Sequence, residues 1–283
     1  MELFAQLLVL GVSSGAIYAL LAGGLVIVFT VTGIVNFMHG QWVVIGALIY
    51  CTLVDRIGTL PAIFAAVAIT AILGALVYRF IVHWVAEASF LHQVLVTIAL
   101  SFFTEGVALV IWGKEPRSAP PFSSGDAISI VGTLISQQSL WIFGMMIVAV
   151  FSIWFFMTCT VVGKAMHACA ANKVAARVVG IKPDHMAIIA FALSGFYGAI
   201  AGISYLPLQA ISYNSGMIYT LKAFVAAIIG GMGSFGGAVL GGFALGIAES
   251  LGAGLISSGY KDTIGYLAMT AIIFYRVIRM AAK

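Results

Sequence analysis

Residues 3–29 read LFAQLLVLGVSSGAIYALLAGGLVIVF, a run of apolar and small residues without a single charge. A transmembrane helix needs roughly 20 mainly apolar residues to cross about 30 Å of hydrocarbon, so this run is long enough. It is too long for the core of a signal peptide and has no basic flank in front of it. We therefore expect it to be retained as a membrane helix.

Apolar runs of the same kind follow along the rest of the chain. Of the 283 residues, 63% are hydrophobic and only 8% are charged, far below the roughly 25% charge of soluble domains. The runs occupy residues 4–30, 37–54, 60–83, 91–112, 139–160, 186–206, 218–231, 237–257 and 263–278. None alternates with the period of two that a barrel strand would show. The pattern predicts an all-α polytopic membrane protein, with about eight or nine transmembrane helices in one domain over residues 1–283.

The segment 161–184, VVGKAMHACAANKVAARVVGIKPD, interrupts these runs and carries four cations. Lys and Arg in short loops stay on the cytoplasmic side, so we expect this segment and the basic C-terminal tail inside and the N-terminus outside. The longest polar interruption, residues 113–138, then faces outside as a loop with room for one short extended piece. It could be a docking surface for an external partner or a plain connector.

Small residues recur at the spacing G-x-x-x-G. The pairs are Gly11 with Gly15, Gly198 with Gly202, Gly237 with Gly241, and Gly242 with Gly246. In lipid, apolar surface gives no driving force for association, and glycines let helix backbones approach closely. The spacing predicts a tightly packed bundle, and it allows similar contacts with a second subunit.

Gly231, Gly233 and Gly236 spell G-x-G-x-x-G, a pattern associated with dinucleotide binding. A dinucleotide site needs a soluble strand before the glycines and an amphipathic helix after them. Both flanks here are instead apolar runs typical of membrane helices. The glycines instead predict a turn or a broken or re-entrant helix, with a role in helix packing. No G-x-x-x-x-G-K-[ST] motif occurs, so the chain has no such site for ATP.

A few polar side chains lie within or between the apolar runs, where they are costly unless they find partners. They are Asn36, His39, Glu105, Lys222 and Glu249. Each is a candidate for the translocation path or for a hydrogen-bonded brace. For Lys222 the structural alternative is snorkelling to the outer interface, and for the two glutamates it is pairing within the bundle. No H-E-x-x-H or G-x-S-x-G motif and no metal-ligand spacing occurs, so we expect neither catalytic nor metal-binding residues.

Three stretches resemble LivH-type permeases, the membrane subunits of branched-chain amino-acid ABC importers. They are GLVIVFTVTGIVNFMHGQ at 24–41, GKAMHACAANKVAARVVGI at 163–181 and AFVAAIIGGMGSFGGAVLGGFALGIAES at 223–250. Asn36, His39 and Gly40 carry most of the first likeness. The second resembles the family's cytoplasmic coupling segment, in which a short helix followed by Gly-Ile docks on the ATPase.

The resemblance implies a set of residues for ATPase coupling: Lys164, Ala170, Ala171, Asn172, Lys173, Arg177, Gly180 and Ile181. The sequence Ala170-Ala171-Asn172 departs from the family, which often has an acid after the alanine. Because of this departure, we expect the cations at 164, 173 and 177 to make the main ionic contacts with the ATPase. The alanine content predicts a helix of about four turns over residues 165–179.

The resemblance also implies the partners. These are a LivM-like second permease subunit or a second copy, two cytoplasmic ATPases that hold ATP and Mg, and a periplasmic or external binding protein. The location would be the bacterial inner membrane, among lipid. The net charge of +4 then reports loop orientation and not nucleic-acid binding. Alternative functions are a related permease for urea, amides or aromatic acids, an ion-coupled secondary transporter, or a membrane-embedded enzyme.

Overall fold

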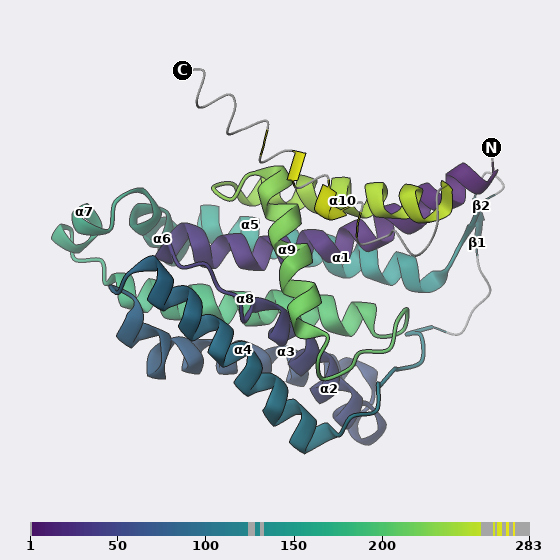
Figure 1. Ribbon diagram of the computed structural model, residues 1–283, viewed down its shortest axis with the longest axis horizontal. Helices are drawn as coiled ribbons and strands as arrows, with labels where there is room; N and C mark the ends of the chain where they lie inside the picture. Colours follow the sequence, from purple (N-terminus) through teal and green to yellow (C-terminus); the bar gives the residue numbers. More distant parts are fainter. Residues whose placement is uncertain are drawn as a thin grey trace.

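The computed structural model describes residues 2–123, 128–130, 133–255, 263, 265–267, 270, 271 and 274 (Figure 1). The helices in chain order are α1 (Glu2–Thr32), α2 (His39–Ile57), α3 (Thr59–Phe80), α4 (Phe90–Trp112), α5 (Gln137–Cys159), α6 (Val161–Ala171), α7 (Lys173–Val178), α8 (Pro183–Tyr205), α9 (Gly216–Gly230) and α10 (Phe235–Leu255). One 3₁₀ turn, η1 (Val82–Val85), lies between α3 and α4.

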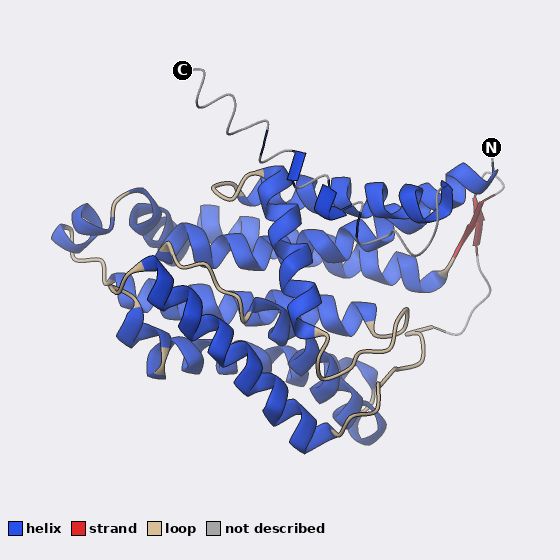
Figure 2. Cartoon of the chain, viewed as in Figure 1, coloured by secondary structure: helices blue, strands red, loops and turns tan. Residues whose placement is uncertain are grey.

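A small hairpin lies within the interruption expected at residues 113–138. Strands β1 (Ile128–Ile130) and β2 (Thr133–Ile135) pair antiparallel with Ile128 opposite Ile135, and they are drawn red in Figure 2. The hairpin lies at the end of the molecule where α1 begins, and α6 and α7 lie at the opposite end (Figure 1). The two polar interruptions of the sequence are therefore at opposite ends of the bundle.

Seven helices among the described residues are long and apolar enough to cross a membrane: α1 to α5, α8 and α10. Helix α9 has 15 residues and spans about 22 Å, which is shorter than the hydrocarbon core of about 30 Å. The seven long helices and this short helix account for eight of the nine expected runs. The last expected run, 263–278, lies mainly outside the described residues. The predicted class, an all-α polytopic membrane protein, is confirmed.

Glycines bring α1 and α10 together along most of their length. A Cβ atom on Gly11 would lie 2.8 Å from Ile247 Cα, and one on Gly15 would lie 2.8 Å from Phe243 Cα. From the other side, a Cβ on Gly246 would overlap the backbone of Gly15. Both partners of this contact carry the G-x-x-x-G spacing, so the two backbones pack directly against each other.

Helix α8 is a second centre of packing, and it contacts both α2 and α3. A Cβ on Gly198 would lie 2.5 Å from Trp42 Cβ, and one on Gly202 would overlap the carbonyl of Val43. Gly237 and Gly241 play the same part between α10 and α9, where added Cβ atoms would overlap the carbonyls of Gly230 and Ala226, respectively. The backbones of α9 and α10 therefore approach closely on either side of the turn at Gly231.

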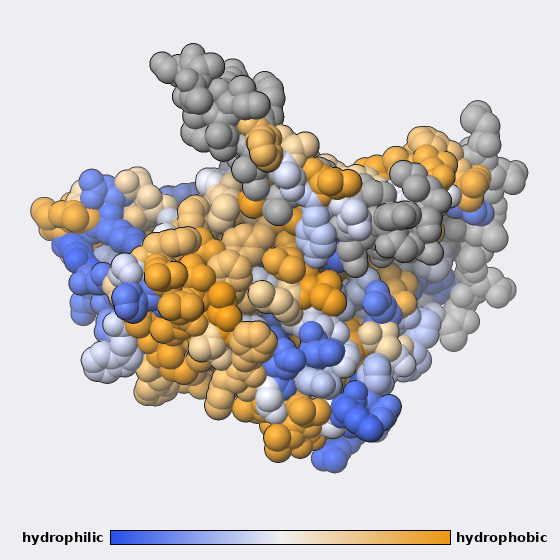
Figure 3. Space-filling view, viewed as in Figure 1, coloured by the Kyte–Doolittle hydropathy of each residue, from blue (hydrophilic) through white to orange (hydrophobic). Residues whose placement is uncertain are grey.

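The outer helices present apolar side chains to their surroundings. Phe64 on α3 is 73% exposed, Phe103 on α4 is 68% exposed, and Val110 on α4 is 85% exposed. In Figure 3 an orange apolar region lies between a blue polar end around α6 and α7 and further polar residues toward the opposite end. Such a large apolar surface fits contact with lipid.

Candidate functional site

Lys222 on α9 and Glu249 on α10 form a buried ion pair. Lys222 Nζ lies 2.6 Å from Glu249 Oε1 and 2.8 Å from Glu249 Oε2. The Tyr18 hydroxyl, on α1, donates to Glu249 Oε2 at 2.7 Å, and the Tyr18 ring centroid lies 5.0 Å from Lys222 Nζ. Lys222 thus pairs inside the bundle, so the snorkelling alternative is wrong.

A cavity of about 170 Å³ adjoins this pair. Its walls come from the end of α8, the connection to α9, the first turns of α9 and the middle of α1. The lining residues are Tyr18, Tyr205, Gln209, Ser215, Ile218, Tyr219 and Lys222. The cavity therefore combines a charged group and several hydroxyls with aromatic and aliphatic surface.

Residues 33–38 join α1 to α2 without helical structure. Gly33, with φ +76°, follows the last turn of α1. The Thr97 hydroxyl lies 3.4 Å from the carbonyl of Val35, and the Thr220 hydroxyl lies 3.1 Å from the carbonyl of Phe37. Buried irregular backbone is tolerated at membrane depth only where protein groups satisfy it, and α4 and α9 supply such groups here.

Asn36 and His39 are fully enclosed in this broken region. Asn36 Oδ1 accepts the N–H of Met38 at 3.0 Å, and His39 Nδ1 lies 2.7 Å from Ser194 Oγ on α8. In the part of the chain that the structure describes, four buried atoms here lack a partner: Asn36 Nδ2, His39 Nε2, Gln41 Oε1 and Trp42 Nε1. An unmade buried hydrogen bond costs about 1–3 kcal/mol, so each of these atoms is a local cost to the folded state.

Glu105 is separate from the Lys222 site. It lies half-buried on α4. Among the described residues it makes no ion pair with Lys222, whose carboxylate partner is Glu249. In the sequence, Glu105 and Glu249 are candidates for one reason, the free-energy cost of a carboxylate within a membrane segment. Of these two acids, the structure brings only Glu249 to Lys222.

The expected four-turn helix over residues 165–179 is in fact two helices. Asn172, with φ −161° and ψ 107°, separates α6 from α7. Its Oδ1 atom accepts the N–H groups of Val174 at 2.9 Å and Ala175 at 3.0 Å, which makes it the N-cap of α7. The departure from the family pattern thus has a structural role of its own.

The Gly-Ile pair ends α7. Gly180 has φ +85°, a conformation that favours glycine. Its N–H donates to the carbonyl of Arg177 at 3.0 Å, and the N–H of Ile181 donates to the carbonyl of Ala176 at 3.0 Å. This is the Schellman pattern of bonds, which satisfies the last carbonyls of a helix.

Two of the cations expected to face the ATPase have partners within the chain. Lys173 Nζ donates to the carbonyl of Thr32, at the C-terminal end of α1, where a positive charge is favourable. Arg177 Nη2 lies 3.1 Å from Glu87 Oε1. Lys164 is exposed on α6. Helix α7 is therefore connected through Lys173 to the point where α1 ends and the broken segment begins.

Sequence reasoning overlooked an apolar surface on the same tip. Val174, Val178 and Val179 are 70%, 83% and 73% exposed, and we call these three residues the valine patch. Ala170 and Ala171 are exposed beside them. In a chain this rich in apolar residues a valine gives no signal of exposure, but the spacing of four between Val174 and Val178 puts both on one helix face.

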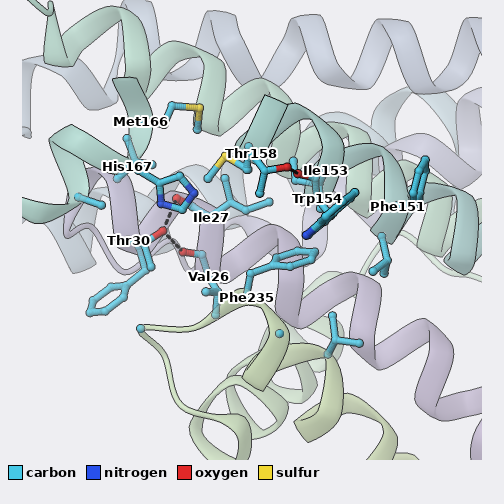
Figure 4. A pocket seen from close by; sticks show the side chains of 18 of the residues that line it. Val26, Ile27, Thr30, Phe151, Ile153, Trp154, Thr158, Met166, His167 and Phe235 are labelled. Carbon is cyan, nitrogen blue, oxygen red and sulfur yellow. Dashed lines mark hydrogen bonds between the residues drawn. The ribbon is translucent and has the colours of Figure 1, made fainter. Parts of the chain in front are cut away.

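An open apolar groove of about 960 Å³ lies between the end of α1, α5, α6 and the start of α10 (Figure 4). Phe151, Trp154 and Phe235 contribute aromatic side chains to its wall. Gly233 and Gly236 also line it, and added Cβ atoms there would meet nothing within 4 Å. Among the described residues these two glycines face the groove and meet no helix, so the packing role expected for them stays a prediction that concerns a second subunit. Gly231, with φ +97°, forms the turn after α9.

The described residues hold no group of three His, Cys, Asp or Glu side chains that could bind a metal ion. The site consists instead of a charged pair beside a cavity, a buried break in the chain, and an exposed tip attached to that break. Such an arrangement provides a partly polar cavity inside the bundle and a direct contact between the tip and the end of α1.

Comparison with known proteins identifies the family. A family model described as branched-chain amino acid transport system / permease component matches residues 7–278. The high-affinity branched-chain amino acid permease protein BraD of Pseudomonas aeruginosa is 28% identical over 96% of this chain and 94% of its own length. LivH of Escherichia coli K12 is 28% identical, with 95% and 92% covered. The ribose import permease protein RbsC of Escherichia coli K12 is 24% identical, with 78% and 68% covered.

Among solved structures, PsaBC from Streptococcus pneumoniae in complex with Fab is similar in fold. The TM-score is 0.51 at 10% sequence identity, with 97% of this chain and 91% of that chain covered. At this identity the likeness concerns the fold alone. Because the family model spans residues 7–278, the chain belongs to the family of permease components of branched-chain amino acid transport systems.

Proposed function

We propose that this chain is the permease subunit of an ATP-binding-cassette importer that carries branched-chain amino acids across the bacterial inner membrane. The observation that carries the proposal is the family match over residues 7–278. The bundle of seven long apolar helices supports a role in translocation. The chain itself would catalyse no reaction, and ATP and Mg would be held by separate ATPase subunits.

The two ends of the bundle fit the partners of such an importer. We place α6 and α7 in the cytoplasm, where basic residues of short loops remain, and the β1–β2 hairpin outside, within reach of a binding protein. A second permease subunit, either LivM-like or another copy, would cover the apolar groove between α5 and α10. The exposure of Phe151 (61%), Trp154 (54%) and Leu240 (71%) beside the groove supports this assignment.

Uptake by reconstituted proteoliposomes tests the proposed function. We expect labelled leucine to accumulate only when the companion permease and ATPase subunits are present, ATP is supplied on the cytoplasmic side and the binding protein on the other. Uptake driven by a proton or sodium gradient without ATP would instead indicate a secondary transporter. ATP-dependent uptake of ribose, urea, amides or aromatic acids, with none of leucine, would overturn the substrate assignment.

The valine patch is the proposed contact with the ATPase. Replacing Val178 with aspartate is expected to lower the ATP hydrolysis stimulated by the binding protein by roughly tenfold or more. The reason is that a carboxylate buried without a partner costs more than the 1.4 kcal/mol that corresponds to a factor of ten. The rate in nanodiscs and the co-purification of the ATPase subunits measure this effect.

Arg177→Gln on the same helix is the matched control. Its exposed pair with Glu87 is worth about 0–1 kcal/mol, so stimulated hydrolysis should stay within about twofold of the unmodified importer. If the glutamine variant loses stimulation and the Val178→Asp variant keeps it, docking is ionic and the valine patch is not the contact.

A further inference from the structure

The cavity beside Lys222 has the capacity of a small-molecule site. A buried water needs about 10–15 Å³ of such volume, so 170 Å³ holds on the order of ten waters or one small organic molecule. Gln209 and Ser215 contribute polar groups to the wall, and Ile218 contributes an aliphatic one. The Tyr205 and Tyr219 rings meet edge to face, with centroids 5.8 Å apart, and form an aromatic wall.

Lys222 lines this cavity, and its ion-pair partner Glu249 lies directly beside it, outside the lining. The side chains of Lys222 and Glu249 are 8% and 2% exposed, so both ions are almost entirely removed from water. A buried pair is weak evidence for stability, because the desolvation penalty of the two ions can exceed their attraction. Ionisable residues inside a membrane protein instead indicate a functional site.

The requirement that no buried charge lose its partner selects the chemical class of ligand. If the pair opened for a neutral molecule such as a sugar, the attraction between the two charges would be lost and the ligand would supply no ion to replace it. If it opened for a singly charged ligand, the site would acquire a net charge. A zwitterion brings one ammonium and one carboxylate, so each member of the pair exchanges one partner of opposite charge for another.

We infer that this cavity is a transit site for the head group of an α-amino acid. Lys222 receives the carboxylate, Glu249 receives the ammonium group, and the aromatic wall with Ile218 accommodates the aliphatic side chain. This inference rests on the proposed function and adds to it a location and a charge requirement for the cargo within the permease itself.

Tyr18 is placed to hold both charges while the pair is open. Its hydroxyl donates to Glu249 Oε2 at 2.7 Å, and its ring lies 5.0 Å from Lys222 Nζ. An aromatic face near a cation stabilises it, by about 2 kcal/mol or more where water is excluded. The three side chains come from α1, α9 and α10, so occupation of the site is sensed by three helices at once.

Photo-crosslinking in the unmodified importer tests the site. Photo-leucine, a diazirine analogue of leucine, should label peptides from residues 205–222 when the complete assembly turns over in proteoliposomes. Excess leucine should abolish this labelling. Isocaproate and isoamylamine, which each lack one of the two charges, should compete at least about tenfold less well, because each leaves one member of the pair without its new partner.

The double variant Lys222→Met/Glu249→Leu provides a second readout. It removes both charges together, and we expect labelling and leucine uptake to fall at least about tenfold while the thermal midpoint stays within a few degrees. Asp55→Asn is the matched control, since it neutralises an exposed acid on α2 that is not paired with Lys222, and it should leave labelling unchanged.

The outcomes distinguish a failure of the proposed site from a failure of the proposed function. If the unmodified assembly shows no ATP-dependent leucine uptake, the proposed function itself fails. If uptake is normal but photo-leucine labels only other segments, the site is wrong while the proposed function stands. The same conclusion follows if the double variant transports normally. Should the double variant fail to fold, labelling of the unmodified importer decides alone.

Discussion

Glu249→Leu is expected to destabilise the protein by about 3–5 kcal/mol, the cost of leaving the partner of a buried ion pair uncompensated. Lys222 Nζ has both carboxylate oxygens of Glu249 within 2.8 Å and would lose them at once. The Tyr18 hydroxyl would also lose its acceptor. The free energy of unfolding in mixed micelles of a mild and a denaturing detergent measures the loss.

The double variant Lys222→Met/Glu249→Leu is the control for this prediction. Replacing a buried pair by apolar residues of similar size is often neutral or stabilising by about 1–4 kcal/mol, so the second substitution should recover most of the stability lost by the first. A double-mutant cycle measures this coupling directly. A loss in the double variant that equals the sum of the losses in the two single variants would show that the two residues are not energetically linked.

Gly246→Leu is expected to prevent α1 and α10 from packing, with loss of most folded protein. Even a Cβ atom at Gly246 would overlap the backbone of Gly15, and backbone cannot move aside as a side chain can. Inserting methylenes into a well-packed core costs about 1–3 kcal/mol where side chains can adjust, and here the two helices would have to separate. Yield of monodisperse protein and the thermal midpoint report the effect.

Gly106→Leu on α4 is the matched control. A Cβ atom at Gly106 would meet nothing within 4 Å, and leucine has a higher helix propensity than glycine by about 1 kcal/mol. This variant should fold as well as the unmodified protein. If both leucine variants fold equally well, the close contact of α1 with α10 is not needed for the fold.

The cytoplasmic tip shows how far local sequence can predict structure. The change from apolar to basic alanine-rich sequence locates the tip, and the Gly-Ile pair locates its end because Gly180 adopts φ +85°. The break at Asn172 was missed, because alanine favours a continuous helix and only the capping bonds from Val174 and Ala175 show that the chain turns there.

Glycine spacing, likewise, predicts some helix contacts within the chain correctly and fails for others. The spacing of Gly198 and Gly202 predicts a close helix contact, and α2 occupies that face of α8. Gly233 and Gly236 look equally suited to packing but border a groove of about 960 Å³. A small residue permits a close approach without specifying which neighbour makes it, so sequence cannot distinguish a helix contact from an open wall.

By itself, the sequence determined the membrane class, the position of most helices and the two polar ends, because all of these depend on local runs of apolar or charged residues. Only the tertiary structure decided that Lys222 meets Glu249 and Tyr18, and that Glu105 is not the partner. Tyr18, Lys222 and Glu249 lie on three different helices, with 231 residues separating Tyr18 from Glu249. Hydropathy shows that a buried charge must find a partner, but which partner depends on how helix faces rotate and pack in three dimensions.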